Sequence, residues 1–461
     1  MKNFLKFEGP SILLLFAVVF IIFWPFIFGG KMMVDEERLG AYYTTFSFYQ
    51  KAIENHESFL WDPNYYGGFP SYLTQFGGFL YPLHYVLARL LPLFAAYYTA
   101  IAFAAFLGLL TAYGFGRAWQ FTRIGSIFLA LSYMSGFNFG AFTAGLSYAN
   151  GFMILPLLCF FLTVAAGAAK WSSYILFILM GGVGLGIGFL AGYPQFVAYA
   201  LVFSGAYVLF LDWERGWSAV LTRFQSTLSY IMIVMIGGLL GAVQILPTFE
   251  LLPFTIRTAH YAIEASDGLR FIPQLVTLVL PTTMRLSPFL LGAQGLYLGT
   301  LVLPLAVIGL IFFRNRPVLF FSSSWLIMAF LALGIPGVNW VNTLPLLSRI
   351  SNPARWFVTG TLPLAWLAAW GYERLRRTDA DFFTRQSVRK FQKIVAIVLG
   401  ATCLALVGLG IFIWRLAADG ELRDQLLSRL TSGRTLTFPL AHYRDVLRIL
   451  IEQATLGFSI T

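Results

Sequence analysis

Three adjacent carboxylates have the clearest chemical potential in this sequence: Asp35, Glu36 and Glu37, in the stretch GGKMMVDEERLGAYY. They follow a long apolar run, in a chain of 461 residues of which only 11% are charged. A carboxylate at a membrane interface can be partly desolvated, which raises its pKa toward neutral pH and suits it to accept a proton. The alternative interpretation is a solvated turn without chemistry, and the three residues alone do not separate the two.

A second group consists of polar side chains that interrupt apolar runs. A polar amide in such a run faces protein or a water-filled cavity, because exposing it to lipid is costly. A tight turn between two helices explains part of this group, and Gln195 would then only hydrogen-bond across helices. For His84 and Tyr297 an ordinary place at the membrane interface is the simpler interpretation. The group comprises Tyr193 and Gln195 in AGYPQ, Gln244 and Glu250 in GAVQILPTFELLP, His84 in YPLHY and Tyr297 in YLG.

The histidines and cysteines do not indicate a metal or redox site. Cys159 and Cys403 each lie inside an apolar run, so neither a disulfide framework nor a thiolate metal site is encoded. The loops contain no Gly-rich phosphate loop. We therefore assign no metal, and Glu250 is the one candidate ligand for a divalent cation. The four histidines without metal-ligand spacing are His56, His84, His260 and His442.

The composition predicts an all-α polytopic membrane protein. Apolar residues make up 58% of the chain, and apolar runs of about 20 residues recur along it. In a soluble protein the net charge of +11 would suggest nucleic acid. Here the basic residues stand in short clusters between apolar runs, which is typical of topology signals. We expect the lipid bilayer as a partner and no nucleic acid.

The apolar runs predict about eleven transmembrane helices. The first has basic residues ahead of it, as a secretory signal does, but it is long and no small-x-small cleavage site follows, so we expect a retained span. The predicted spans are 11–29, 92–112, 124–142, 149–168, 174–191, 195–211, 228–247, 296–313, 318–334, 357–373 and 394–415.

The basic clusters predict a cytoplasmic N-terminus. Simple alternation of the spans puts every cluster on one side, from Lys2 and Lys6 to Arg374, Arg376 and Arg377. Short cytoplasmic loops carry an excess of Lys and Arg, so this side is the cytoplasm. The polar and Pro/Gly-rich segments then share the outer face, which makes that face the expected place for chemistry. These segments are 30–91, 143–148, 192–194, 248–295 and 335–356.

The first outer loop, 30–91, has its own predicted structure. Phe46, Tyr49 and Ile53 recur at helical spacing, which predicts an amphipathic helix over 41–56 at the membrane surface. The following segment, 59–85, contains Asp-Pro, Gly-Gly and Tyr-Pro steps that interrupt a helix, together with many aromatic residues. We expect it to form a structured cap.

Several outer arginines run against the charge trend. Arg355 in NPARW stands at the start of a span, beside Trp356. Arginine side chains at span ends commonly reach into lipid headgroups, which is the simpler interpretation for any one of them. As a group on the face that should be poor in arginine, they indicate an anion site. Its candidate members are Arg355, Arg349 and Arg257, with Arg270 and Arg285 further outer arginines.

The ordered motifs in 30–360 resemble the bacterial YfhO family, which is similar to the GT-C class of multi-spanning glycosyltransferases. They are the acids after the first span, WDPNYYGGFP, LYP, AGYPQ, QILPTFELL, YLG and NPARW. Proteins of that class resemble one another in using a polyprenyl-phosphate-linked sugar donor and a first-loop Asp or Glu as general base. The resemblance therefore implies transfer of a hexose or N-acetylhexosamine to an envelope acceptor outside the bacterial cytoplasmic (inner) membrane, such as a teichoic acid or glycolipid.

By position, the resemblance gives the role of base to Asp35, with Glu36 as the nearest alternative. The donor phosphate would bind Arg355, with Arg349 and Arg257 sharing the work. The resemblance also implies that other outer polar residues line the substrate site: Gln195, Tyr193, Gln244, Glu250, His84 and Tyr297.

The domain organisation is predicted as a GT-C-like transmembrane domain over 1–415 and an amphipathic outer tail over 416–461. The chain is shorter than many relatives, so it is either a short form or lacks a further C-terminal region. A transporter or flippase of lipid-linked precursors is the alternative function, but it predicts ionisable residues deep in the spans and two repeated halves, and the sequence has neither. A scaffold without catalysis is the third interpretation.

Overall fold

The structure is a computed structural model with two compact units, Met1–Arg376 and Arg377–Thr461. In the second unit only residues 377 and 421 are described, so the predicted boundary at residue 415 stays a prediction. The described residues are 2–33, 38–65, 67–73, 78–135, 145–214, 224–254, 298–312, 315–335, 338–344, 347–349, 355–377 and 421.

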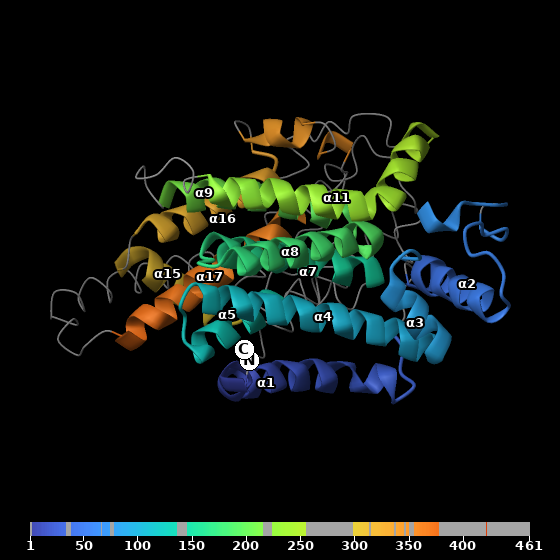
Figure 1. Cartoon of the computed structure of the whole chain (residues 1–461), viewed down its shortest axis with the longest axis horizontal. Coiled ribbons are helices and arrows are strands. Elements are labelled where there is room, and N and C mark those ends of the chain that lie inside the picture. The colour runs from blue at the N-terminus through green and yellow to red at the C-terminus, as the bar shows by residue number, and fades with distance from the viewer. Residues whose placement is uncertain are drawn as a thin grey trace. The chain divides into compact units, whose positions relative to one another are not determined.

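Six helices among the described residues are long and apolar enough to cross a membrane. Helices form here because a backbone in lipid must satisfy its hydrogen bonds within the segment. In Figure 1, α1 runs beside α4, and α8 runs beside α11. The protein is therefore an all-α, multi-pass membrane protein, as its composition predicts. The six helices are α1 (Lys2–Ile27), α4 (Leu93–Ala118), α7 (Leu146–Ala166), α8 (Trp171–Ala191), α9 (Pro194–Glu214) and α11 (Gln225–Leu251).

Four further helices coincide with predicted spans. Three of them are shorter apolar helices. The last predicted span, 394–415, lies outside the described residues. The four helices are α5 (Arg123–Met134), α15 (Val302–Phe312), α16 (Arg316–Ala332) and α17 (Trp356–Arg377).

Glycines let α8 and α11 approach closely. A Cβ added at Gly182 of α8 would lie 2.5 Å from Ile236, and one added at Gly241 of α11 would lie 2.5 Å from Phe189. Small residues at such contacts bring helix backbones together, which drives packing where lipid provides no hydrophobic force. The glycine positions thus fix how these two spans pair.

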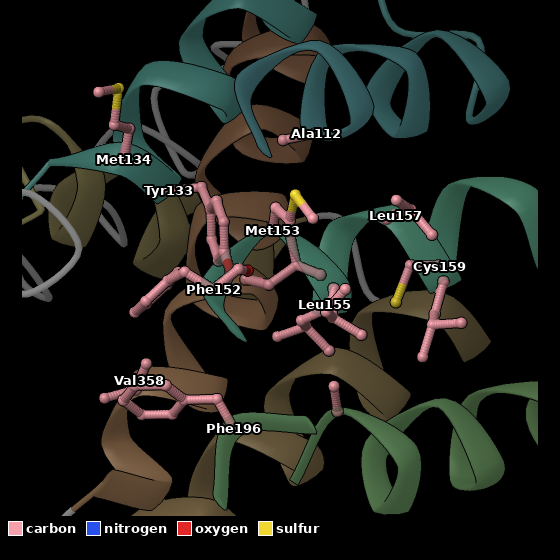
Figure 2. Packing of buried hydrophobic residues seen from close by; sticks show 14 of the residues in the cluster. Ala112, Tyr133, Met134, Phe152, Met153, Leu155, Leu157, Cys159, Phe196 and Val358 are labelled. Carbon is pink, nitrogen blue, oxygen red and sulfur yellow. The ribbon is translucent and has the colours of Figure 1, made fainter. Parts of the chain in front are cut away.

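Helix α17 lies in the core, and its residues from Trp356 to Gly371 are all buried. Its Val358 belongs to a core shared with α5, α7 and α9, shown in Figure 2. Phe152 of α7 packs 5.6 Å from the Tyr133 ring and 5.5 Å from the Phe196 ring, measured between centroids. Arg355 immediately precedes α17, so its backbone is held by a helix that is buried over most of its length.

The first loop forms the predicted helix, and the cap over 59–85 stays a prediction. Helix α2 (Tyr43–Glu54) buries Phe46, Tyr49 and Ile53, the three residues whose spacing predicted it. It packs against α3 (Pro82–Leu90), and the two lie together at one end of the bundle in Figure 1. The Tyr49 hydroxyl donates to the carbonyl of Phe79 at 3.0 Å, which ties the helix to the predicted cap segment.

Described parts of the predicted outer segments meet at this same end, which we call the loop end. The Tyr193 amide donates to the Ser147 carbonyl at 2.8 Å, joining 192–194 to 143–148. The Tyr42 ring of the first loop lies 6.3 Å from the ring of Tyr148. Simple alternation of the spans predicts this gathering, because connections of the same parity share a membrane face.

At the opposite end of the bundle, buried carboxylates have donors. Glu8 accepts hydrogen bonds from Tyr113 and from Arg117 Nη2, the latter at 3.0 Å. Glu373 accepts from the Thr122 amide at 2.7 Å, at the start of α5. Burying a charge is costly unless it has partners: Glu8 is ion-paired with Arg117, and Glu373 Oε1 is hydrogen-bonded to Thr122.

Candidate functional site

The loop end holds an arginine whose described hydrogen-bond partners are all neutral. Arg355 Nη1 donates to the Tyr193 hydroxyl at 2.9 Å and to Gln195 Oε1 at 2.7 Å, while Nη2 donates to the Tyr148 hydroxyl at 2.8 Å. We call these four residues the arginine cluster. Sequence reasoning nominated Arg355, Tyr193 and Gln195 separately, and the fold brings them into direct contact.

Two tyrosine rings also pack against the guanidinium. The rings of Tyr148 and Tyr193 stack with centroids 4.6 Å apart and planes 16° from parallel. Arg355 Cζ lies 5.3 Å and 4.9 Å from these two centroids. Aromatic faces attract a cation without neutralising it. The cluster therefore holds the guanidinium plane in place and leaves its charge available.

A further layer orients the Gln195 amide. Its Nε2 donates to the Tyr199 hydroxyl at 3.0 Å, which leaves Oε1 facing Arg355. The Tyr199 ring stacks on Trp356 at 3.7 Å, and Trp356 Nε1 donates to Asn342 Oδ1 at 2.8 Å. Hydrogen-bonded and stacked partners on α9, α17 and the segment before α17 thus fix the acceptor that Arg355 uses.

The charge of Arg355 is unpaired among the described residues. The ion pairs described in the structure join Glu8 to Arg117 and Arg123, at the opposite end. Arg355 Nε is buried and has no hydrogen-bond partner among those residues. Burial lowers the pKa of Arg355, but the hydroxyl oxygens of Tyr193 and Tyr148 raise it, and the net pKa lies above its ordinary value. The result is a half-buried, permanently charged donor whose buried Nε–H group is unused by the described residues.

The first loop reaches the arginine cluster through Tyr42. Its ring packs against Gly145, where an added Cβ would lie 2.4 Å from the ring, and against Tyr148. On the other side of the acidic run, the Met33 amide donates to the Tyr98 hydroxyl and the Met33 carbonyl accepts from Tyr43, both at 2.8 Å. Asp35 and Glu36 lie outside the described residues, in the short segment between these two anchors.

His84, in α3 at the end of the predicted cap segment 59–85, is fully buried. Its Nδ1 lies 3.1 Å from the Gly78 carbonyl, and its Nε2 lies 3.4 Å from Asn150 Nδ2. Gly78 has a φ of +55°, a conformation that favours glycine, and a Cβ there would meet the His84 ring at 2.8 Å. These contacts join the predicted cap segment to α7, and the role of His84 in lining a substrate site stays a prediction.

The other nominated residues lie apart from the described cluster contacts or outside the described residues. Gln244 is buried in α11, and Glu250 is exposed near the end of that helix. Arg349 ends a 3-10 turn, Leu347–Arg349, and its side chain is outside the description. Within the described residues no group of His, Cys, Asp and Glu could hold a metal ion. The nominated residues outside the description are Arg257 and Tyr297.

Sequence reasoning missed Tyr148, Tyr199 and Tyr42. Tyr148 ends one of the predicted outer segments, and the aromatic side chain at a span end is the only signal that marked it. Nothing in the sequence ties it to a residue 207 positions away. Tyr199 lies four residues after Gln195, on the same side of a helix, so its contact with Gln195 could be expected once Gln195 was chosen.

Comparison with known proteins gives a structural likeness alone. No protein-family model and no curated protein sequence matches the chain. The chain is similar to the crystal structure of ArnT from Cupriavidus metallidurans bound to undecaprenyl phosphate, at a TM-score of 0.49 and 13% identity, covering 97% of this chain and 71% of that one. For ArnT in the apo state the TM-score is 0.48 and the identity 13%, covering 98% and 71%. The resemblance to the YfhO family therefore rests on the sequence motifs.

Proposed function

We propose that the protein is a membrane glycosyltransferase that moves a sugar from a polyprenyl-phosphate donor to an envelope glycan or glycolipid. The acceptor oxygen forms a bond to the anomeric carbon while the bond from that carbon to the phosphate oxygen breaks. The phosphate leaves with the electron pair, and the acceptor proton passes to the Asp35 carboxylate, with Glu36 as the alternative base. The motif resemblance and the arginine cluster support this proposal.

The observation that carries it is the Arg355 guanidinium held by neutral partners. A structural arginine in a protein interior is normally paired with a carboxylate, because an unpaired buried charge is costly. Arg355 instead keeps its charge and an unused Nε–H, at the end of the bundle where the loops meet. A phosphate oxygen is a suitable ligand, because charge-assisted hydrogen bonds to arginine are among the strongest in proteins.

The first loop supports a role for Asp35 through its anchors. Asp35 is two residues after Met33 in the sequence, and two residues of extended chain reach at most about 7 Å. Met33 is fixed by hydrogen bonds to Tyr98 and Tyr43, and Tyr42 touches the cluster residue Tyr148. The described residues on both sides of the acidic run thus lie at the same end of the bundle as Arg355, which supports Asp35 as the base.

The remaining parts of the proposal follow the predicted topology. The loop end faces the extracytoplasmic side of the bacterial cytoplasmic membrane, and the N-terminus is inside. Arg349 and Arg257 share the binding of the donor phosphate. Polar contacts to the sugar or the acceptor come from Gln244, Glu250, His84 and Tyr297, and Glu250 is also the candidate ligand for a divalent cation.

The charge distribution in the spans disfavours the transporter alternative. In the six candidate spans, acidic and basic residues occur only near the ends, such as Glu8, Arg117, Asp212 and Glu250. A transporter coupled to ions or carrying a charged headgroup across the bilayer needs ionisable groups at mid-depth.

The test measures donor binding and sugar transfer separately. Purified protein would be given radiolabelled undecaprenyl phosphate for binding, and undecaprenyl-phosphate glucose or N-acetylglucosamine with envelope extract for transfer. Asp35→Asn should bind undecaprenyl phosphate normally and lose transfer by about 100-fold or more, since general-base catalysis contributes about that much. Arg355→Gln should lose both.

Arg374→Gln is the matched control, because Arg374 also packs on an aromatic ring, 4.1 Å from the centroid of Trp370, at the other end of the same helix. It should leave binding and transfer unchanged. Equal binding by wild type and Arg355→Gln would exclude Arg355 as the phosphate ligand, and full transfer by Asp35→Asn would exclude Asp35 as the base.

A further inference from the structure

An apolar groove lies between α9 and α16, on the half of the bundle away from the arginine cluster. Its cavity volume is about 530 Å³. Lining residues recur at positions i, i+3 or i+4, and i+7 on both helices, so the groove follows them for about two turns, roughly 10 Å. Residues that line it include Ala206, Phe210 and Trp213 of α9 and Leu319, Phe320 and Ser323 of α16.

The walls of the groove suit a hydrocarbon chain. The rings of Phe210 and Phe320 stack with centroids 4.4 Å apart and planes 15° from parallel. The hydroxyls of Ser322 and Ser323 donate to the carbonyls of Leu319 and Phe320 in their own helix, at 3.1 and 3.0 Å. Because these donors are used internally, the groove makes little polar demand on its occupant.

One end of the groove carries an exposed positive charge. Arg316 Cζ lies 5.1 Å from the centroid of the Trp213 ring, and Trp213 lines the groove. Arg316 forms no ion pair with any residue in the described ranges. It also stands at the N-terminus of α16, where the helix dipole favours an anion. A tryptophan and an arginine at the end of a span mark the level of the lipid headgroups.

We propose that this groove binds an anionic glycerophospholipid from the leaflet on the Arg316 side. Its headgroup phosphate lies against Arg316, and one acyl chain follows Phe210 and Phe320 toward Ala206. Gln195 and Trp213 are 18 positions apart on α9, which places the groove headgroup roughly 27 Å from the arginine cluster. The lipid site is therefore separate from the proposed donor site and does not rest on the proposed function.

Native mass spectrometry of the purified full chain tests this. The protein would be incubated with phosphatidylglycerol or with phosphatidylcholine of the same acyl chains, and the bound fraction measured. Wild type should prefer phosphatidylglycerol, and Arg316→Gln should reduce that preference by about fivefold, the contribution of one basic residue near a lipid surface. Ser323→Trp should fill the groove and lower the binding of phosphatidylglycerol while Arg316 remains.

Two matched controls accompany these variants. Lys170→Gln removes an exposed cation beside the exposed Trp171 at the same end of the bundle, and Leu239→Trp adds the same bulk to an exposed position of α11. Both should bind phosphatidylglycerol as wild type does. The proposal is overturned if Arg316→Gln and Ser323→Trp bind phosphatidylglycerol like wild type, or if the lipid preference is absent. A competition experiment uses equimolar undecaprenyl phosphate. If it displaces phosphatidylglycerol from wild type but not from Arg316→Gln, a phospholipid is overturned as the occupant of the groove.

Discussion

Arg355 and Tyr148 are 207 positions apart in the chain, yet Arg355 Nη2 donates to the Tyr148 hydroxyl at 2.8 Å. The contact joins the residue before α17 to the first turn of α7. Tyr193 and Gln195, at the start of α9, complete the set of acceptors. Three helix ends therefore converge on one guanidinium, and each can be tested by a substitution that changes a single property.

Gln195→Glu tests the importance of a neutral cluster. The substitution is nearly isosteric, and the carboxylate would pair with Arg355 across the present 2.7 Å contact. We expect the fold to be retained and the binding of undecaprenyl phosphate to fall by about tenfold or more, because a charged hydrogen bond contributes about 1.5–3 kcal/mol. Binding in detergent with radiolabelled undecaprenyl phosphate measures this. Gln225→Glu adds the same charge at the opposite end and should bind normally; unchanged binding by Gln195→Glu would contradict the anion site.

Two substitutions at Tyr148 separate its hydroxyl from its ring. Tyr148→Phe removes one acceptor of Arg355 and should lower stability by about 1 kcal/mol. Tyr148→Leu also removes the ring beneath the guanidinium and should cost about 0.5–1 kcal/mol more. Thermal unfolding in detergent measures both losses of stability, and Tyr148→Leu should be less stable than Tyr148→Phe. Binding of undecaprenyl phosphate should likewise be weaker in Tyr148→Leu than in Tyr148→Phe. Tyr230→Phe, which removes a 2.9 Å hydrogen bond to the Leu201 carbonyl, should affect stability without affecting binding.

Gly145→Ala tests the packing of the first loop against α7. The backbone at Gly145 is extended, with φ at 179°, so alanine causes no backbone strain there. Its Cβ would instead lie 2.4 Å from the Tyr42 ring, and we expect destabilisation of about 1–3 kcal/mol from overpacking. Gly205→Ala is the control, since its Cβ would meet the Tyr230 hydroxyl at an ordinary 3.6 Å. Equal thermal unfolding temperatures for the two variants would argue against a fixed Tyr42 contact.

Glu8→Gln tests the opposite end of the bundle. Glu8 is buried and joins α1 to α4 through Tyr113 and Arg117. Removing its charge should cost about 1.5–3 kcal/mol, because it weakens hydrogen bonds to a charged group. The thermal unfolding temperature should fall while undecaprenyl phosphate binding is kept. Glu54→Gln, at an exposed position of α2, should change neither property; a loss of binding in Glu8→Gln would show that the two ends are coupled.

The helical fold was predictable from particular runs of the sequence. Each of the first ten predicted spans overlaps a helix, because about 20 apolar residues in a bilayer have to form one. The helix around Phe46, Tyr49 and Ile53 was predictable for a similar reason, since a 3.6-residue period places all three on one buried face. Charge alternation predicted which connections meet at one end, and the contact between Tyr193 and Ser147 agrees with it.

The arginine cluster was predictable only in part. The sequence by itself determined the composition of the loop end, including Arg355, Tyr193 and Gln195, because polar residues at span ends are rare enough to stand out. Only the tertiary structure decided that Tyr148 joins them, that Arg355 has neutral partners in the described residues, and that His84 is fully buried. These facts depend on how α7, α9 and α17 pack, and spacing along one chain carries no information about which side chains meet across three helices.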